Sequence, residues 1–336
     1  MRLPIPVVLA VLLAAAHPRA HASPDPLVLA RPSVRTWSEP DGLPQATVHA
    51  IAFDREGFLW VGTQDGAARF DGRTWDRVEL PGKKVSRFVR AVLPAKDGAV
   101  WFGKEEGGLV RVRAGGAELF DRSEGLPAGR VNHLLERADG TVWAATHGGG
   151  VARFTGSGFL GVSEGLPDLR VWRLLERRDA AGRPRLVAAC EGGVAELGDD
   201  DRWTAVDLGT PLAGYSANSL LSTGEGDGAA LWVGTFGAGV FRVSGGRVER
   251  FGPANGLASR LVTCLAATTG EDGRTVVWAG TRDAGVFRLA GEVFEPVRAG
   301  PSLSEVYALA PGSGVNADTL WVGTRLAGIS RVREAP

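Results

Sequence analysis

The amino-acid sequence predicts an all-β fold, a seven-bladed β-propeller of four-stranded antiparallel blades. The pentapeptide LWVGT occurs three times without change, at residues 59–63, 231–235 and 320–324. Diverged copies lie between these, so that the Trp position recurs at residues 60, 101, 143, 187, 232, 278 and 321, at intervals of 41 to 46 residues. A self-similar period of this length indicates a repeat architecture. The 48 glycines agree with it, because short strands need many tight turns.

The first 22 residues are predicted to be a secretory signal peptide that precedes the repeats. Met1 and Arg2 form a short basic start, residues 7–16 are almost wholly apolar, and residues 20–22 form a small-x-small cleavage signal. The apolar run is short for a membrane span, which leaves a retained anchor as the alternative. We therefore expect a signal peptide at 1–22 and a single propeller domain at 23–336. The protein would be periplasmic or secreted, with no membrane insertion after cleavage.

The first repeat shows how one blade is built. Its apolar runs predict strands at 48–53, 58–63, 67–70 and 74–78, and glycine-containing turns separate them. A small sheet that is apolar on both faces must bury each face against the sheet of a neighbouring repeat. Seven such sheets close into a ring. We expect each Trp to lie between adjacent blades, with close backbone approach at the glycine two residues later. The alternative is that the Trp rings stack on a sugar ligand.

The ends of the repeat array predict how the ring closes. The last repeat offers only three strands, at 305–309, 320–324 and 328–332. A matching fourth strand, residues 33–38, precedes the first repeat. We expect this N-terminal strand to complete the seventh blade, because the ring would otherwise expose an unpaired sheet edge.

Charge and cysteine content narrow the range of partners. The chain has 38 basic and 38 acidic side chains, a balance that does not favour nucleic acid or an anionic membrane as a partner.

Its two cysteines, Cys190 and Cys264, fall in the fourth and sixth repeats, which should not be neighbours. A disulfide requires α-carbons within about 7 Å. We therefore expect two free, buried thiols in a monomeric protein.

The repeat resembles a known family. Its pattern is an acidic or Asn residue before Gly-Leu-Pro, then V-x-x-I/L, D-G-x-x-W-V-G-T and G-G-V-x-R-F, with Gly-Leu-Pro at 42–44, 125–127 and 165–167 and Gly-Leu at 256–257. This pattern resembles the two-component regulator propeller repeat of bacterial sensor proteins, over essentially all of residues 33–332. The resemblance implies an extracytoplasmic ligand-sensing propeller, commonly fused to a signalling kinase. This sequence has one ring and shows no immunoglobulin-like module, membrane helix or kinase after it, so a separate signalling partner is expected.

One face of the propeller is the expected binding site, because loops around the ring axis can diverge while the scaffold repeats. Two sets of residues should meet there. The first set follows the Val48-type position of each innermost strand: His49, Arg90, Asn132, Trp172, Asn218, Thr263 and Tyr307. The second set lies in the loops after each second strand: Gln64, Asp65, Lys104, Glu105, Glu106, His147, Glu191, Phe236, Arg282, Asp283 and Arg325. They would line a mixed polar and aromatic site for a small molecule or oligosaccharide, or remain solvated loop ends.

The sequence predicts binding rather than catalysis. His147, Glu191 and Glu106 lie in loops of consecutive repeats and could meet, where they would suit acid–base chemistry or a divalent metal. Their spacing follows from the repeat period alone, and the chain has no nucleophile elbow, paired-cysteine metal signature or phosphate loop. We therefore expect no enzyme, cofactor or metal. A lyase-like or lactonase-like propeller enzyme remains an alternative, as does a scaffold that binds a signalling or envelope protein through the same face.

Overall fold

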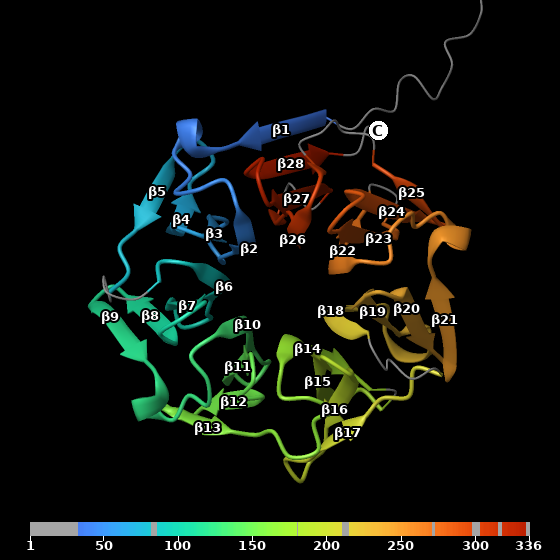
Figure 1. Ribbon diagram of the computed structural model, residues 1–336, viewed down its shortest axis with the longest axis horizontal. Helices are drawn as coiled ribbons and strands as arrows, with labels where there is room; N and C mark the ends of the chain where they lie inside the picture. Colours follow the sequence, from blue (N-terminus) through green and yellow to red (C-terminus); the bar gives the residue numbers. More distant parts are fainter. Residues whose placement is uncertain are drawn as a thin grey trace, which may run out of the picture.

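Seven four-stranded antiparallel sheets form a ring in the computed structural model (Figure 1). The described residues are 33–81, 86–179, 181–209, 215–270, 273–297, 303–314 and 318–333. The predicted signal peptide lies outside them. Helical structure within these residues is limited to short 3-10 turns, namely η1 (Glu39–Asp41), η2 (Arg122–Glu124), η3 (Gly226–Gly228) and η4 (Pro253–Asn255). None of their helices is long and apolar enough to cross a bilayer.

Six blades are built from four consecutive strands each, the first being innermost. Blades 1 and 2 contain β2 (Val48–Phe53), β3 (Leu59–Thr63), β4 (Gly66–Phe70), β5 (Trp75–Val78), β6 (Val89–Pro94), β7 (Val100–Lys104), β8 (Leu109–Arg113) and β9 (Gly116–Phe120). Blades 3 and 4 contain β10 (Val131–Glu136), β11 (Val142–Thr146), β12 (Val151–Phe154), β13 (Phe159–Gly161), β14 (Val171–Arg178), β15 (Pro184–Cys190), β16 (Gly193–Leu197) and β17 (Trp203–Ala205). Blades 5 and 6 contain β18 (Ser216–Thr223), β19 (Ala230–Phe236), β20 (Gly239–Ser244), β21 (Arg247–Phe251), β22 (Val262–Thr269), β23 (Thr275–Thr281), β24 (Val286–Ala290) and β25 (Val293–Pro296).

Blade 7 joins the two ends of the described chain. Its strands are β26 (Val306–Pro311), β27 (Thr319–Thr324), β28 (Ile329–Arg333) and, outermost, β1 (Ser33–Trp37). β1 pairs antiparallel with β28 from Ser33–Arg333 to Trp37–Ile329. Figure 1 shows β1 lying along the outer edge of β28. The predicted closure by the N-terminal strand is therefore confirmed.

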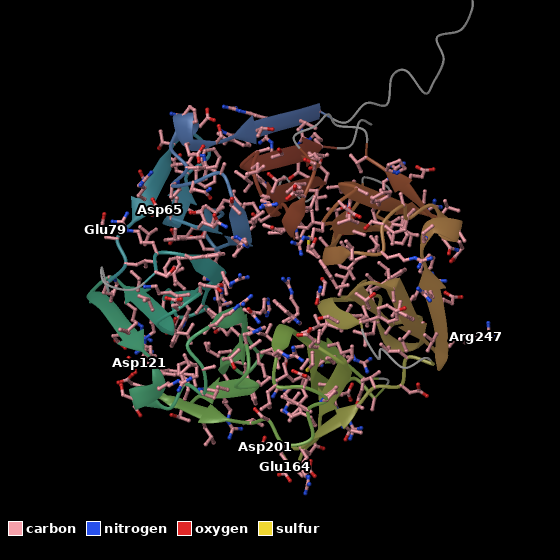
Figure 2. The ribbon with its side chains drawn as sticks, viewed as in Figure 1. Asp65, Glu79, Asp121, Glu164, Asp201 and Arg247 are labelled. Carbon is pink, nitrogen blue, oxygen red and sulfur yellow. The ribbon has the colours of Figure 1, made fainter. Side chains whose placement is uncertain are left out.

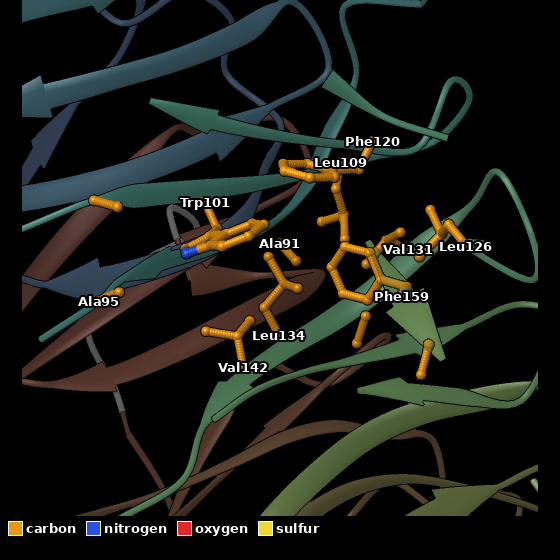
Figure 3. Close-up of a cluster of buried hydrophobic side chains, with 13 residues drawn as sticks. Ala91, Ala95, Trp101, Leu109, Phe120, Leu126, Val131, Leu134, Val142 and Phe159 are labelled. Atoms are coloured by element: carbon orange, nitrogen blue, oxygen red, sulfur yellow. The ribbon is translucent and has the colours of Figure 1, made fainter. Parts of the chain in front are cut away.

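The hydrophobic core consists of seven clusters, one in each seam between adjacent blades. In the seam between blades 2 and 3, Trp101 is 1% exposed and packs with Leu134 and Val142 of blade 3 (Figure 3). Trp143, Trp232, Trp278 and Trp321 are buried in the same way, which confirms the predicted position of these rings. Trp60 differs, because its ring is only partly buried. Its Nε1 donates to Asp54 Oδ2 at 2.8 Å.

The glycine of LWVGT permits close contact across each seam. A Cβ atom on Gly62 would lie 2.7 Å from Val89 Cγ1 in the next blade. At Gly234 the same atom would lie 2.8 Å from Val262 Cγ1. A side chain at Gly62 or Gly234 would push neighbouring blades apart, so glycine recurs at this position in five blades, while blades 3 and 4 have the small residues Ala145 and Ala189 there.

The Gly-Leu-Pro motif forms the connection between blades. Asp121 caps η2 through its side chain, which accepts from the Ser123 N–H, and Gly125 ends the turn at φ 86°. A Cβ atom on Gly125 would lie 2.3 Å from the Phe159 carbonyl oxygen, so only glycine fits. Leu126 follows at 1% exposure in the adjoining core cluster. The motif therefore fixes one blade to the next.

The two cysteines are unpaired and buried. Cys190 ends β15 in blade 4, and Cys264 lies in β22 of blade 6. Burial raises the pKa of each thiol to about 12, so both stay protonated at neutral pH. The expectation of free, buried thiols agrees with this structure.

Candidate functional site

All seven innermost strands carry a β-bulge at the same position. The ladder to the second strand shifts between Val48 and Ala50 in blade 1, and at the equivalent place in every other blade. The skipped residues are His49, Arg90, Asn132, Trp172, Asn218, Thr263 and Tyr307. A bulge releases one residue from the ladder and redirects its side chain. We term the side of the ring that carries these seven residues the bulge face.

The loops after the second strands lie on this same face. The N–H groups of Glu105 and His147 donate to the carbonyls of Phe88 and Arg130, which come just before the innermost strands, at 2.9 and 3.0 Å. Glu191, Arg282 and Arg325 are bonded in the same way. The two residue sets predicted from the sequence therefore share one face.

His49 lies in an aromatic stack that spans three blades. Its ring centroid is 4.8 Å from that of Tyr307 in blade 7, with an interplanar angle of 17°. On the other side it is 4.5 Å from the ring of Phe88, which precedes the innermost strand of blade 2. The stack carries contacts from blade 7 through blade 1 to blade 2.

Arg90 and Arg130 share one carboxylate beside this stack. Arg90 Nε donates to Glu105 Oε2, and Arg130 Nη1 lies 3.5 Å from the other oxygen of the same group, Oε1. The Arg90 guanidinium lies 4.7 Å from the Phe88 ring centroid, and Arg130 Nε donates to Asn132 Oδ1 at 3.2 Å. Two cations are thus held by a single anion.

Ring contacts of Trp172 with Arg130 and His147 extend this set of side chains to blade 4. The Arg130 guanidinium lies 5.5 Å from the Trp172 ring centroid, and the His147 ring meets Trp172 edge-on at 5.3 Å. Further along, Glu191 pairs with Arg170 at 3.1 Å. Contacts on the bulge face therefore link five consecutive blades. We term the central residues the bulge-face cluster: His49, Phe88, Arg90, Glu105, Arg130, His147, Trp172 and Tyr307.

The two arginines make the cluster electropositive. Burial, followed by the charges of Arg90 and Arg130, lowers the pKa of His49 to about 3, so its ring is neutral at pH 7. Burial and then Arg130 lower the pKa of His147 as well. Burial and the repulsion from Arg130 lower the pKa of Arg90 to about 10, which leaves it charged at neutral pH.

Three ring nitrogens in the cluster are buried without a hydrogen-bond partner among the described residues. They are His49 Nε2, His147 Nδ1 and Trp172 Nε1. A buried polar group without a partner costs about 1–3 kcal/mol. Such groups are satisfied when a molecule bound here donates to them or accepts from them.

Other predicted residues lie outside the cluster. Asn132 and Glu191 adjoin it, but the Asn132 amide donates to the Val171 carbonyl at 2.8 Å and so also fastens blade 3 to blade 4. Thr263 likewise fastens blade 6 to blade 7 through the Val306 carbonyl. Other side chains contact residues outside the cluster: Asn218 with Ser216, Phe236 with Arg282, Asp283 with Ser259, and Arg325 with Glu305. The binding features thus concentrate in one part of the ring.

Lys104 occupies a different kind of position. It ends β7 where five other second strands have Thr, whose hydroxyl in each case donates to a glycine carbonyl in the following turn. Lys104 is 2% exposed and lines a pocket with Asp65 and Arg77 of blade 1, and burial lowers its pKa. Glu105 therefore takes the place on the bulge face that was assigned to Lys104.

The sequence reasoning missed Phe88, Arg130 and Arg170. Each stands two residues before a bulge residue, separated from it by a fully buried valine. Alternate residues of a strand share a face, so this spacing was the signal that could have identified them.

Glu106 does not join His147 and Glu191, the arrangement considered as the alternative, catalytic reading. Glu106 is exposed, and the carboxylate that reaches the cluster is that of Glu105. Within the part of the chain that the structure describes, no group of three His, Cys, Asp or Glu residues could hold a metal ion.

Acid should destabilise the fold through His49. The unfolded chain takes up this proton near pH 6.5, whereas the folded protein takes it up only near pH 3, so stability is full above pH 6.5 and falls as pH drops toward 3. His49→Gln should remove part of this loss, up to about 4 kcal/mol. Urea titrations of both proteins between pH 3 and 8 measure their free energies of unfolding. The difference between the two proteins at pH 8, where His49 is neutral in both states, gives the stability lost through the substitution itself. Curves that stay parallel across the range would contradict the assignment.

The first repeat matches a known family. The model described as "Two component regulator propeller" matches residues 42–65, which run from the first Gly-Leu-Pro through β3. The resemblance seen in the sequence is confirmed there. None of the curated proteins matches the chain at a significant level.

Solved structures share the fold at low sequence identity. The extracellular domain of a hybrid two component system from B. thetaiotaomicron is 18% identical with a TM-score of 0.71, over 90% of this chain and 42% of that one. The corresponding domain of a one component system from the same organism is 16% identical with a TM-score of 0.69, over 90% and 39%. Virginiamycin B lyase from Staphylococcus aureus is 15% identical with a TM-score of 0.68, over 90% and 99%. The chain thus spans less than half of each sensor domain and nearly all of the lyase.

Proposed function

We propose that this protein is a non-enzymatic, extracytoplasmic propeller of the sensor type. It binds a small molecule or an oligosaccharide on the bulge face and passes the signal to a separate partner protein. The observation that carries the proposal is the bulge-face cluster, which brings together side chains from several blades and contains three ring nitrogens that have no hydrogen-bond partner among the described residues.

The contrast between fixed and variable positions supports a binding role. Trp stands at its position in six of the seven second strands and Gly follows two residues later in five of them, whereas the seven bulge positions carry six different residue types. A bulge residue contributes little to the ladder, and a rigid ring holds it in place. Variable residues on a rigid scaffold are typical of ligand sites.

The sensor character rests on the family pattern. The match at residues 42–65 and the fold shared with extracellular domains of two bacterial sensor systems support it. The predicted signal peptide supports a location outside the cytoplasm. The chain spans less than half of each of those domains, and the separate partner protein is part of this proposal.

A ligand screen tests the proposal. Sugars, oligosaccharides, sugar acids and amino acids would be screened by thermal shift, and the affinity for each hit measured by calorimetry. Trp172→Phe keeps an aromatic ring but removes the unpartnered Nε1–H, so it should weaken binding about fivefold or more with little change in melting temperature.

The matched control is Trp60→Phe, which removes an indole N–H that is bonded to Asp54 in the seam. It should leave affinity unchanged. Equal affinity of wild type and Trp172→Phe for every hit would argue against the site. Conversion of a hit into a product would replace the proposal with a lyase-type enzyme.

A further inference from the structure

We propose that Arg90 and Arg130 form an oxyanion site on the bulge face, and that Glu105 is a built-in competitor for it. The ligand would then be a small hydroxylated molecule that carries a carboxylate or a phosphate group. This inference rests on the proposed ligand-binding function and names the chemical class of its ligand.

The balance of charge favours an anion. Arg90 and Arg130 contact one carboxylate between them, that of Glu105. The next carboxylates along the face, Asp168 and Glu191, pair with Arg170 at 2.9 and 3.1 Å. Among the described residues, Glu105 is therefore the sole anionic contact of the pair, so the pair carries one more positive charge than its contact balances, whereas Arg170 with its two carboxylates carries one more negative charge.

The geometry leaves donors available. A guanidinium has five N–H groups. Arg90 uses its Nε toward Glu105, and Arg130 uses its Nε toward Asn132 and its Nη1 toward Glu105. The Phe88 and Trp172 rings contact the two guanidiniums at 4.7 and 5.5 Å. These stacking contacts hold the planar groups in place, which suits bidentate recognition of an oxyanion.

The flanking nitrogens indicate what else the ligand carries. The His49 ring lies on the Arg90 side, beside Phe88, while the Trp172 and His147 rings lie on the Arg130 side. One nitrogen of each ring is buried without a hydrogen-bond partner among the described residues. Trp172 can only donate, and each neutral imidazole nitrogen either donates or accepts. Hydroxyl groups do both. An acid with several hydroxyls would satisfy the arginines and these nitrogens together.

Glu105 sets the affinity of such a site. It lies in the loop after β7, and its carboxylate occupies the same guanidiniums that an incoming anion needs. An anionic ligand must share the pair with Glu105 or displace it. Both routes weaken binding, whereas a neutral ligand does not meet this repulsion. Whether affinity rises or stays the same when the Glu105 charge is removed therefore tells an anionic ligand from a neutral one.

Two substitutions at this contact should act in opposite directions. Glu105→Gln frees the arginines and should tighten binding of D-glucuronate or inorganic phosphate about tenfold, the scale expected for one charge at close range near a protein surface. Arg90→Gln should weaken the same binding about tenfold or more. Calorimetry at low ionic strength measures both, with D-glucose as the neutral probe. A fold defect cannot produce the tighter binding.

Glu118→Gln is the matched control, because it removes an arginine-paired carboxylate from the outer strand of the same blade. It should leave every affinity unchanged. Stronger binding of glucuronate than phosphate identifies a carboxylate ligand, and the reverse order identifies a phosphate.

Three results would overturn the oxyanion site. The first is that D-glucose binds as tightly as glucuronate. The second is that the affinity for the anions is unchanged or weaker in Glu105→Gln. The third is that neither anion binds to wild type or to Glu105→Gln. The proposed function is tested separately, since a screening hit that depends on Trp172 would still support it.

Discussion

A chain that lacks residues 23–38 should lose several kcal/mol of its free energy of unfolding, a large share of the 5–15 kcal/mol typical of a folded protein. The deletion removes β1 and its ladder to β28. It also removes Trp37, which is 4% exposed and stacks on Trp321 at 5.2 Å. The edge of β28 would then be exposed to water and to other strand edges. Urea unfolding followed by circular dichroism measures the loss.

Two single substitutions in β1 test whether the lost stability comes from ring closure or from shortening the chain. Trp37→Ala should reproduce much of the loss, because it empties a buried site in the seam between blades 7 and 1. Ser33→Ala, at an exposed position of the same strand, should have almost no effect. If the truncated chain unfolded at the same urea concentration as the full chain, β1 would not close the ring.

Trp101→Ala should cost about 3–5 kcal/mol of stability, the range measured when a buried Trp or Phe is truncated to Ala. The Trp101 ring packs against Phe154 at 5.0 Å and Phe120 at 5.5 Å, so truncation leaves a large void in the seam between blades 2 and 3. Denaturant unfolding with tryptophan fluorescence gives the change directly.

The equivalent change at Trp60 should cost clearly less. Its ring is only partly buried, and the loss of its bond to Asp54 occurs near solvent, which can replace it. Equal losses at the two positions would mean that the repeat alone, and not the local burial, determines the energy.

The architecture was predictable because every blade needs the same two features. The Trp of LWVGT recurs in six blades and its Gly in five, which marks the repeat, and a missing strand at one end with a spare strand at the other predicted the closure. Trp60 lies between two blades as expected, although its ring is only partly buried. Its seam is the one that holds Lys104, whose long side chain replaces the small Thr of other blades.

The sequence predicted on which face of the ring the site residues lie, but it predicted much less about which of their side chains contact one another. His49, Arg90, Trp172 and Tyr307 were assigned to one face because they share a place in the repeat, and the bulges confirm that assignment. Which of them meet depends on side chains that reach across seams, such as Arg130 reaching Glu105 and Trp172. A linear repeat does not contain that information. Lys104 was assigned to the site although it stands at the structural Thr position of the second strands and is buried.

The pairing of β1 with β28 also affects how the protein folds. Thr36 and Ser330 share a hydroxyl–hydroxyl bond at 2.8 Å although 294 residues separate them. Hairpins within the other six blades bring together neighbouring residues and can form early, whereas this contact requires the largest loop in the molecule to close. The ring should therefore assemble as an open arc of blades whose last step is the docking of β1. Until that step, the arc can capture the first strand of a second chain, so slow refolding at high concentration favours strand-exchanged dimers.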